Sequence, residues 1–173
     1  MSSHPKHPAL VHFPITFTTV TGALDALYFA SIHPSTAPLV VSACKTFDIS
    51  LNPGLLPTLS YYTTILTILT AIPAIMSGVW ELMPVIKRDG FSSKKAQTGA
   101  LHALVNDLTV FGAAYNWWTR RNELGFVPTG TNVLVSSALG VPATLFAAYL
   151  GGELVYTYGM GVGRGSSKAK KSQ

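Results

Sequence analysis

Histidine and glutamate residues near the ends of four apolar stretches are the residues of this chain that could do chemistry. His7 and His12 lie at the start of the first stretch. Glu81 is close to the end of the second, and His102 and Glu153 belong to the third and fourth. Imidazole and carboxylate groups together suit zinc or iron, and a pair of imidazoles can hold a haem iron. The sequence therefore raises two cofactor hypotheses: a divalent metal held among these five residues, and a haem b with His12 and His102 as axial ligands.

The composition indicates the environment in which these residues must be positioned. The chain has 173 residues, enough for one domain, and is 48% hydrophobic but only 11% charged. An average soluble domain is about 25% charged, and the mean hydropathy here is +0.36. Such a chain cannot cover a globule with polar surface, so we predict an integral membrane protein. The basic residues lie mostly in connections and the C-terminal tail, without interleaved aromatic residues, which argues against a nucleic-acid partner.

The apolar stretches are long enough to be membrane spans. A helix needs about 20 apolar residues to cross the hydrocarbon layer. The stretches that meet this length are residues 10–32, 56–83, 98–118 and 132–156. We therefore predict an all-α protein, a four-span transmembrane helical bundle within residues 10–158. Residues 1–9 would form an N-terminal tail, and residues 159–173, rich in Gly, Ser and Lys, a disordered basic tail.

Prolines crowd the entry to the first span. Pro5, Pro8 and Pro14 each fix φ and lack a backbone N–H. The segment is therefore expected to stay extended until Pro14 takes a place in the first turn of a helix that begins near Phe13.

The connections between the spans predict the orientation. Four spans put both termini on one side of the membrane, together with the connection at residues 84–97. That side carries nine of the twelve Lys and Arg residues, and the other side carries three. The positive-inside rule then places the N- and C-termini in the cytosol. The connection at residues 33–55 has an apolar centre at residues 39–41, which predicts a short helix at the membrane interface.

This topology predicts that the chemically capable residues meet at one membrane face. The first and third spans begin there, and the second and fourth end there. Asp25 lies outside this group, near the outer end of the first span, where Arg120 is its candidate partner. Polar side chains in a membrane usually face the bundle interior, and glycines let backbones approach closely. The further members of the predicted inner-face cluster are Asn106, Tyr156, Gly151 and Gly152.

Four segments of the chain resemble a known family. They are HPALVHFPI at residues 7–15, SGVWEL at 77–82, GALHALVND at 99–107 and GGELVYTYGMGV at 151–162. They resemble DUF2231, a family of small predicted membrane proteins without an established activity. The resemblance implies a four-helix membrane bundle. Relatives joined to Rieske-type or cytochrome-like domains imply redox components in the surroundings.

Three hypotheses for function stay open from the sequence. The first is a structural or interaction role, in which the polar cluster fixes the helices in the lipid bilayer, as a homo-oligomer or within a redox membrane complex. The second is a haem- or metal-binding redox protein. The third is a small ion or proton translocating protein, although we see no internal repeat in the sequence. The chain lacks a Gly-x-Ser-x-Gly elbow, so enzymatic activity is expected only through a metal or haem.

Overall fold

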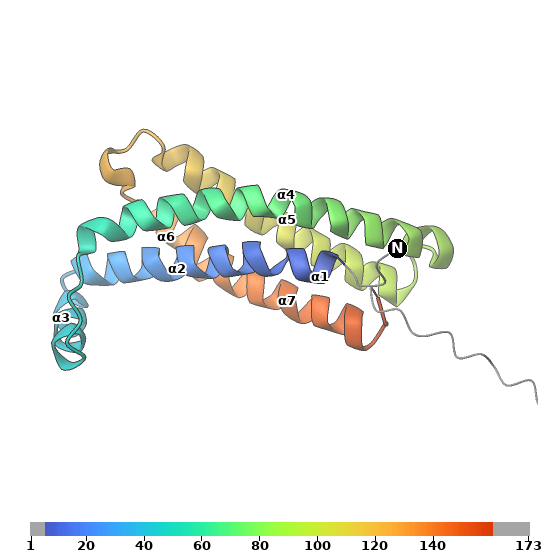
Figure 1. Cartoon of the computed structure of the whole chain (residues 1–173), viewed down its shortest axis with the longest axis horizontal. Coiled ribbons are helices and arrows are strands. Elements are labelled where there is room, and N and C mark those ends of the chain that lie inside the picture. Colours follow the sequence, from blue (N-terminus) through green and yellow to red (C-terminus); the bar gives the residue numbers. More distant parts are fainter. Residues whose placement is uncertain (1–5, 161–173) are drawn as a thin grey trace, which may run out of the picture.

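The computed structural model describes residues 6–160, which form helices and connections without a strand (Figure 1). The all-α prediction is confirmed. His4 and most of the expected disordered tail, from residue 161 onward, lie outside the described residues.

The first span begins earlier than the prolines suggested. α1 (His7–Leu10) and α2 (His12–Ile32) follow one another with only Val11 between them. Pro8 lies in the first turn of α1, and Pro14 lies in the first turn of α2. The first N–H groups of a helix have no partner within it, so a proline at these places removes no hydrogen bond. The expectation of an extended approach to about residue 13 was therefore wrong.

Two helices of very different length follow. α3 (Ala37–Thr46) is a short helix on the predicted apolar segment, and it projects away from the long helices in Figure 1. After η1 (Pro53–Leu55), α4 (Leu56–Asp89) continues for 34 residues. It ends at Gly90, whose φ of +76° is a conformation that favours glycine.

The second half of the chain repeats the pattern of two long helices. α5 (Lys94–Arg120) begins at Ser93, whose side chain accepts a hydrogen bond from the backbone N–H of Ala96. It is followed by η2 (Leu124–Phe126), α6 (Gly130–Val133), the π-helical segment η3 (Leu134–Gly140) and α7 (Val141–Tyr156). Pro142 cannot donate to the helix before it, and the widened π turn places that missing bond at the junction of η3 and α7.

The long helices pack side by side with small and hydroxylated residues between them. α2 contacts α4, α4 contacts α5, α5 contacts α7, and both η3 and α7 contact α2. Many large apolar side chains lie outside: Trp80 is 83% exposed and Phe111 is 69% exposed. This inversion is typical of helices that pack in lipid, where small residues allow close approach. The buried interior includes Thr18, Thr21, Thr64, Thr67, Ala71, Ala74, Ala96 and Ala147.

Three helical stretches among residues 6–160, and not the predicted four, are long and apolar enough to cross a membrane. They are His7–Ile32, Pro53–Asp89 and Gly130–Tyr156. α5 has 27 residues, so its length suffices. Its composition does not, because polar residues such as Gln97, His102, Asn106, Asp107 and Asn116 recur along it.

The start of α1, the α4–α5 turn and the end of α7 lie at the same end of the molecule (Figure 1). A hydrogen bond of 3.2 Å from Lys95 Nζ to the carbonyl of Tyr158 joins two of these segments. We call this the histidine end, because His7 and His102 lie near it. The opposite end, from which α3 projects, we call the ion-pair end.

Candidate functional site

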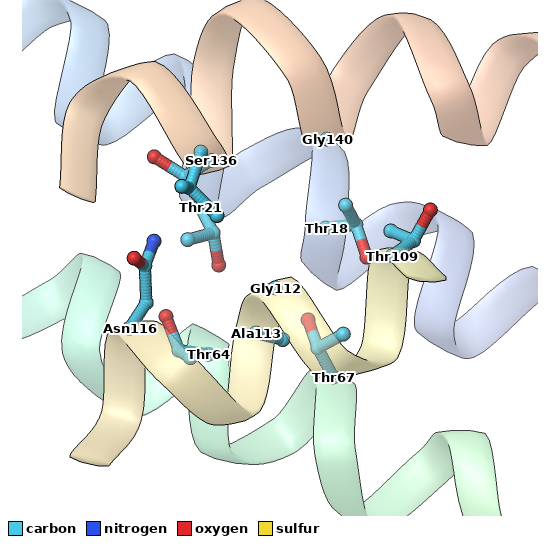
Figure 2. A pocket seen from close by; sticks show the side chains of 11 residues that line it. Thr18, Thr21, Thr64, Thr67, Thr109, Gly112, Ala113, Asn116, Ser136 and Gly140 are labelled. Atoms are coloured by element: carbon cyan, nitrogen blue, oxygen red, sulfur yellow. The ribbon is translucent and has the colours of Figure 1, made fainter. Parts of the chain in front are cut away.

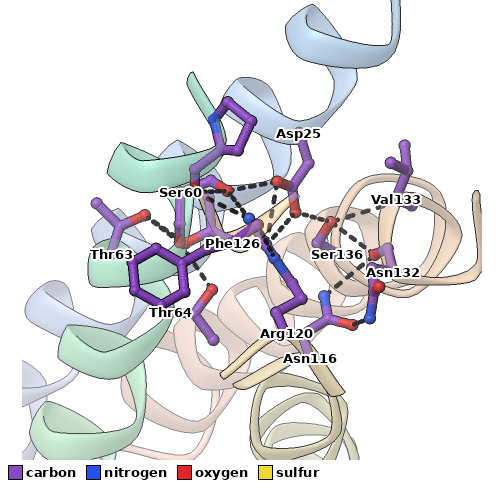
Figure 3. Close-up of polar contacts among 12 residues, drawn as sticks. Asp25, Ser60, Thr63, Thr64, Asn116, Arg120, Phe126, Asn132, Val133 and Ser136 are labelled. Atoms are coloured by element: carbon purple, nitrogen blue, oxygen red, sulfur yellow. Dashed lines mark hydrogen bonds and ion pairs between the residues drawn. The ribbon is translucent and has the colours of Figure 1, made fainter. Parts of the chain in front are cut away.

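A buried ion pair joins α2 to α5 near the ion-pair end (Figure 3). Arg120 Nη1 lies 3.3 Å from Asp25 Oδ1, and both side chains are fully buried. The Asp25 carboxylate also accepts hydrogen bonds from Ser60 Oγ on α4 and, at 2.7 Å, from Ser136 Oγ on η3. All four long helical segments therefore meet at one carboxylate, and the predicted pairing of Asp25 with Arg120 is confirmed.

The guanidinium group is satisfied on every side. Arg120 Nε donates to the carbonyl of Phe126 at 2.9 Å. Its Nη2 donates to the carbonyl of Pro57 at 2.9 Å and to Ser60 Oγ at 2.7 Å. A buried ion pair is tolerated only when its remaining donors and acceptors are paired in this way. Within residues 6–160 no buried side-chain nitrogen or oxygen lacks a partner.

Two asparagines extend this network toward the middle of the protein. Asn132 Nδ2 donates to Asn116 Oδ1 at 3.0 Å, and Asn116 Nδ2 donates to the carbonyl of Asn132 at 3.1 Å. Ser136 Oγ, which bonds Asp25, also lies 3.0 Å from that carbonyl. These two hydrogen bonds hold α5 against α6, where the last long helical segment begins. We call Asp25, Ser60, Asn116, Arg120, Asn132 and Ser136 together the ion-pair layer, and each of their buried side-chain nitrogen and oxygen atoms has a partner within the protein.

A small cavity lined by several threonines lies next to this layer (Figure 2). Its volume of about 20 Å³ is enough for one water molecule. Thr64 and Thr67 line it, and their hydroxyl groups donate to backbone carbonyls of α4. Thr18, Thr67 and Thr109 line both this threonine cavity and a larger cavity beyond it. The two cavities are therefore neighbours along the interior.

The larger cavity, which we call the histidine cavity, occupies the histidine end. Its volume is about 520 Å³, and residues from α1, α2, α4, α5 and α7 line it. This size is in the range of pockets that hold drug-sized ligands and cofactors. Most of its wall is apolar, with side chains such as Val11, Ile75, Val79 and Leu82. Members of the predicted inner-face cluster in this wall are His7, His12, Glu81, His102, Asn106, Gly151, Gly152 and Tyr156.

The His7 ring is held against α4. Its Nδ1 lies 3.0 Å from the carbonyl of Ala74 and 3.0 Å from Ser77 Oγ. A carbonyl can only accept, so Nδ1 carries the proton and Nε2 is left with a free lone pair in the neutral ring. A Cβ added to Gly78 would lie 2.9 Å from His7 Cε1, so only glycine leaves room for the ring there.

The His102 ring is held against α7 in the same manner. Its Nδ1 lies 2.8 Å from the carbonyl of Ala147, which again assigns the proton to Nδ1. A Cβ at Gly151 would lie 3.2 Å from His102 Cε1. Asn106 Nδ2 donates to the carbonyl of His102 at 2.8 Å and makes a longer contact of 3.3 Å with Nε2.

These contacts reveal an internal repeat that the sequence did not disclose. Each histidine bonds a carbonyl on the facing helix, and the glycine beside the ring is the fourth residue after that carbonyl. Asp25 follows His7 by 18 residues, and Arg120 follows His102 by 18 residues. The equivalent residues meet: the imidazole centroids are 6.1 Å apart with an interplanar angle of 85°, and the two charged residues pair. The two halves differ in sequence, but each contains the same arrangement of a histidine bonded to a facing helix and a charged residue 18 positions later.

The remaining predicted site residues take different places. His12 lines the cavity but has an exposed side chain, so the imidazole that faces His102 belongs to His7. Glu81 Oε1 accepts a long hydrogen bond of 3.4 Å from the backbone N–H of His7, while Glu153 lies outside the cavity wall. Within residues 6–160, no three His, Cys, Asp or Glu side chains converge in a way that could hold a metal ion.

A family model described as a predicted membrane protein, DUF2231, matches residues 3–164. No curated protein and no solved structure gives a match.

Proposed function

The chain belongs to the DUF2231 family of predicted membrane proteins, and from this premise we propose that it is a four-span membrane protein that binds a ligand in the histidine cavity. The proposal treats α5 as the fourth span. Its polar residues Asn116 and Arg120 are buried against the other helices, whereas Leu108 and Phe111 are exposed. A helix whose polar side chains are satisfied inside the protein can present an apolar surface to lipid. Both termini then share one side, which the basic residues assign to the cytosol.

The observation that supports ligand binding is that one end of the interior is a closed polar network, whereas the other end holds a cavity. The ion-pair layer is closed, because its buried donors and acceptors bond one another. The histidine end borders a cavity of about 520 Å³, whose wall includes two imidazoles that are fixed through Nδ1. A role limited to holding helices together, the first of the three hypotheses from the sequence, accounts for the closed ion-pair layer but needs no cavity. Mostly apolar pockets with a few fixed polar groups are typical ligand sites.

The experiment compares what co-purifies with three forms of the full chain in mild detergent. Ala103→Phe places a ring in the cavity wall, and Ala26→Phe makes the same change on the exposed side of α2. Organic extracts of each protein are analysed by mass spectrometry. We expect a molecule that is enriched in the natural chain and in Ala26→Phe and is at least tenfold depleted in Ala103→Phe. Identical extracts from all three proteins would contradict ligand binding.

A second candidate function, proton passage, is supported by the neighbouring cavities. Thr18, Thr67 and Thr109 separate the histidine cavity from the threonine cavity, whose wall includes Asn116 and Ser136 of the ion-pair layer. Polar groups therefore follow one another along the interior. We expect a proton flux into liposomes that Thr67→Val reduces and Thr70→Val, outside both cavity walls, leaves unchanged. A flux no greater than that of empty liposomes would remove this candidate.

A further inference from the structure

We infer that the histidine cavity takes a haem-class ligand, a metal carried in its own macrocycle, with His7 and His102 as the two protein ligands of the metal. This inference rests on the proposed function, because it names the ligand class for the same cavity. It also replaces the pair expected from the sequence, since His7 takes the place of His12.

The protonation pattern of the two imidazoles is the first argument. Metal-bound histidines usually donate the N–H of their other ring nitrogen to a carbonyl or carboxylate, which fixes the ring and its tautomer. His7 and His102 both have Nδ1 at a backbone carbonyl, at 3.0 Å and 2.8 Å. Each ring is thus fixed with Nε2 as a potential ligand atom. The longer contact of Asn106 with Nε2 of His102 can be given up, since Asn106 keeps its shorter bond to the carbonyl.

The distance between the rings is the second argument. A bond from a metal to an imidazole nitrogen is about 2.0–2.1 Å, so two imidazoles on opposite sides of one metal have centroids roughly 6 Å apart. The centroids of His7 and His102 are 6.1 Å apart, and their planes are nearly perpendicular at 85°.

The third argument concerns the remaining ligands of the metal. Among residues 6–160, no set of three side chains of the ligating types surrounds a common point. Two imidazoles alone do not complete the coordination of zinc or iron, so the metal would have to bring its other ligands. A macrocycle does this, and the apolar walls and volume of about 520 Å³ suit a large planar apolar ligand better than a bare ion.

The test adds iron protoporphyrin IX to the purified full chain in detergent and records the visible spectrum. We expect stoichiometric binding with the low-spin spectrum of iron held by two imidazoles. His7→Ala and His102→Ala should each weaken binding at least tenfold and abolish that spectrum. His33→Ala, in the exposed connection after α2, should leave both unchanged. Free imidazole added to the His102→Ala protein should restore the low-spin spectrum, which shows that the variant still folds.

The outcomes separate this inference from the proposed function. Binding that survives both alanine variants, or that is lost in His12→Ala but not in His7→Ala, would overturn the assignment. If the macrocycle fails to bind while Ala103→Phe still depletes another co-purified molecule, the haem-class inference falls and ligand binding stands. If neither the macrocycle nor any other molecule depends on the cavity, both fall.

Discussion

Asp25 and Arg120 lie at equivalent positions in the two halves of the chain, yet they carry opposite charges and bind each other. Each follows the histidine of its own half by 18 residues, and the two side chains meet at 3.3 Å in the buried interior. Two identical halves would bring like charges together at this point. Opposite charges therefore favour one pairing of halves, α1–α2–α4 with α5–α7, within a single chain.

Removal of either charge should strongly destabilise the protein. In Asp25→Asn, Arg120 stays buried while its anionic partner becomes neutral, and breaking a buried pair in this way costs about 3–5 kcal/mol. We expect a large drop in the thermal unfolding midpoint in detergent. Lys45→Gln, an exposed cation on α3, is the matched control and should change the midpoint little. Equal midpoints for Asp25→Asn and the natural chain would mean that the pair contributes nothing to stability.

An alanine in place of either glycine beside the histidine rings should destabilise the protein. Gly78→Ala would put a Cβ 2.9 Å from the His7 ring, and Gly151→Ala would put one 3.2 Å from the His102 ring. Overpacking of this kind costs about 1–3 kcal/mol, and the closer contact should cost more. Gly152→Ala is the control, because no heavy atom lies within 4 Å of the added Cβ. The thermal unfolding midpoint of Gly78→Ala should be lower than that of Gly151→Ala, and the midpoint of Gly152→Ala should equal or exceed that of the natural chain.

The sequence was sufficient to predict which ends of the helices come together, because apolar length and alternating direction decide that. His7, Glu81 and His102 accordingly line one cavity. The choice between His7 and His12 depends on how α1 continues into α2 and on how each helix is rotated about its axis. Those features depend on close contacts between helices, such as that of Gly78 with the His7 ring. The pattern of residues along one helix does not reveal such contacts.

The repeat was hidden for a related reason. Asp25 and Arg120 have opposite charges, so a comparison of residue types does not show that they occupy equivalent positions in the two halves. Their contact in the structure shows it. The hydropathy of α5 also differs from what the sequence analysis expected. Residues 98–118 were predicted to span the membrane from their apolar residues, but Asn116 and other polar residues keep α5 out of the three candidate spans.

The topology of α5 has a direct test. In a Cys44→Ser background, Ser92→Cys places a thiol in the α4–α5 turn and Glu123→Cys places one after the end of α5. If α5 crosses the bilayer, a membrane-impermeant maleimide added to sealed, oriented vesicles should label only one of the two sites. Labelling of both sites from the same side would show that α5 does not span. Detergent-solubilised protein, in which both cysteines should react, controls for buried thiols.

The short helix α3 should lie at the membrane interface at the ion-pair end. Its exposed side chains include Leu39 and Val41, and Phe47 follows its last turn, so water alone would leave an apolar surface uncovered. Cys44, the single cysteine of the chain, lies on this helix and allows a nitroxide label without any substitution. In liposomes, we expect collision rates with oxygen and with a water-soluble nickel chelate that correspond to a depth of about 5–10 Å below the headgroup boundary. Leu39→Ser together with Val41→Ser should shift the label toward water, since two exposed apolar side chains of α3 are then replaced by polar ones. A label that is fully accessible to the nickel chelate in the unsubstituted chain would instead place α3 in the aqueous phase, where its apolar side chains would have to be covered by another protein surface.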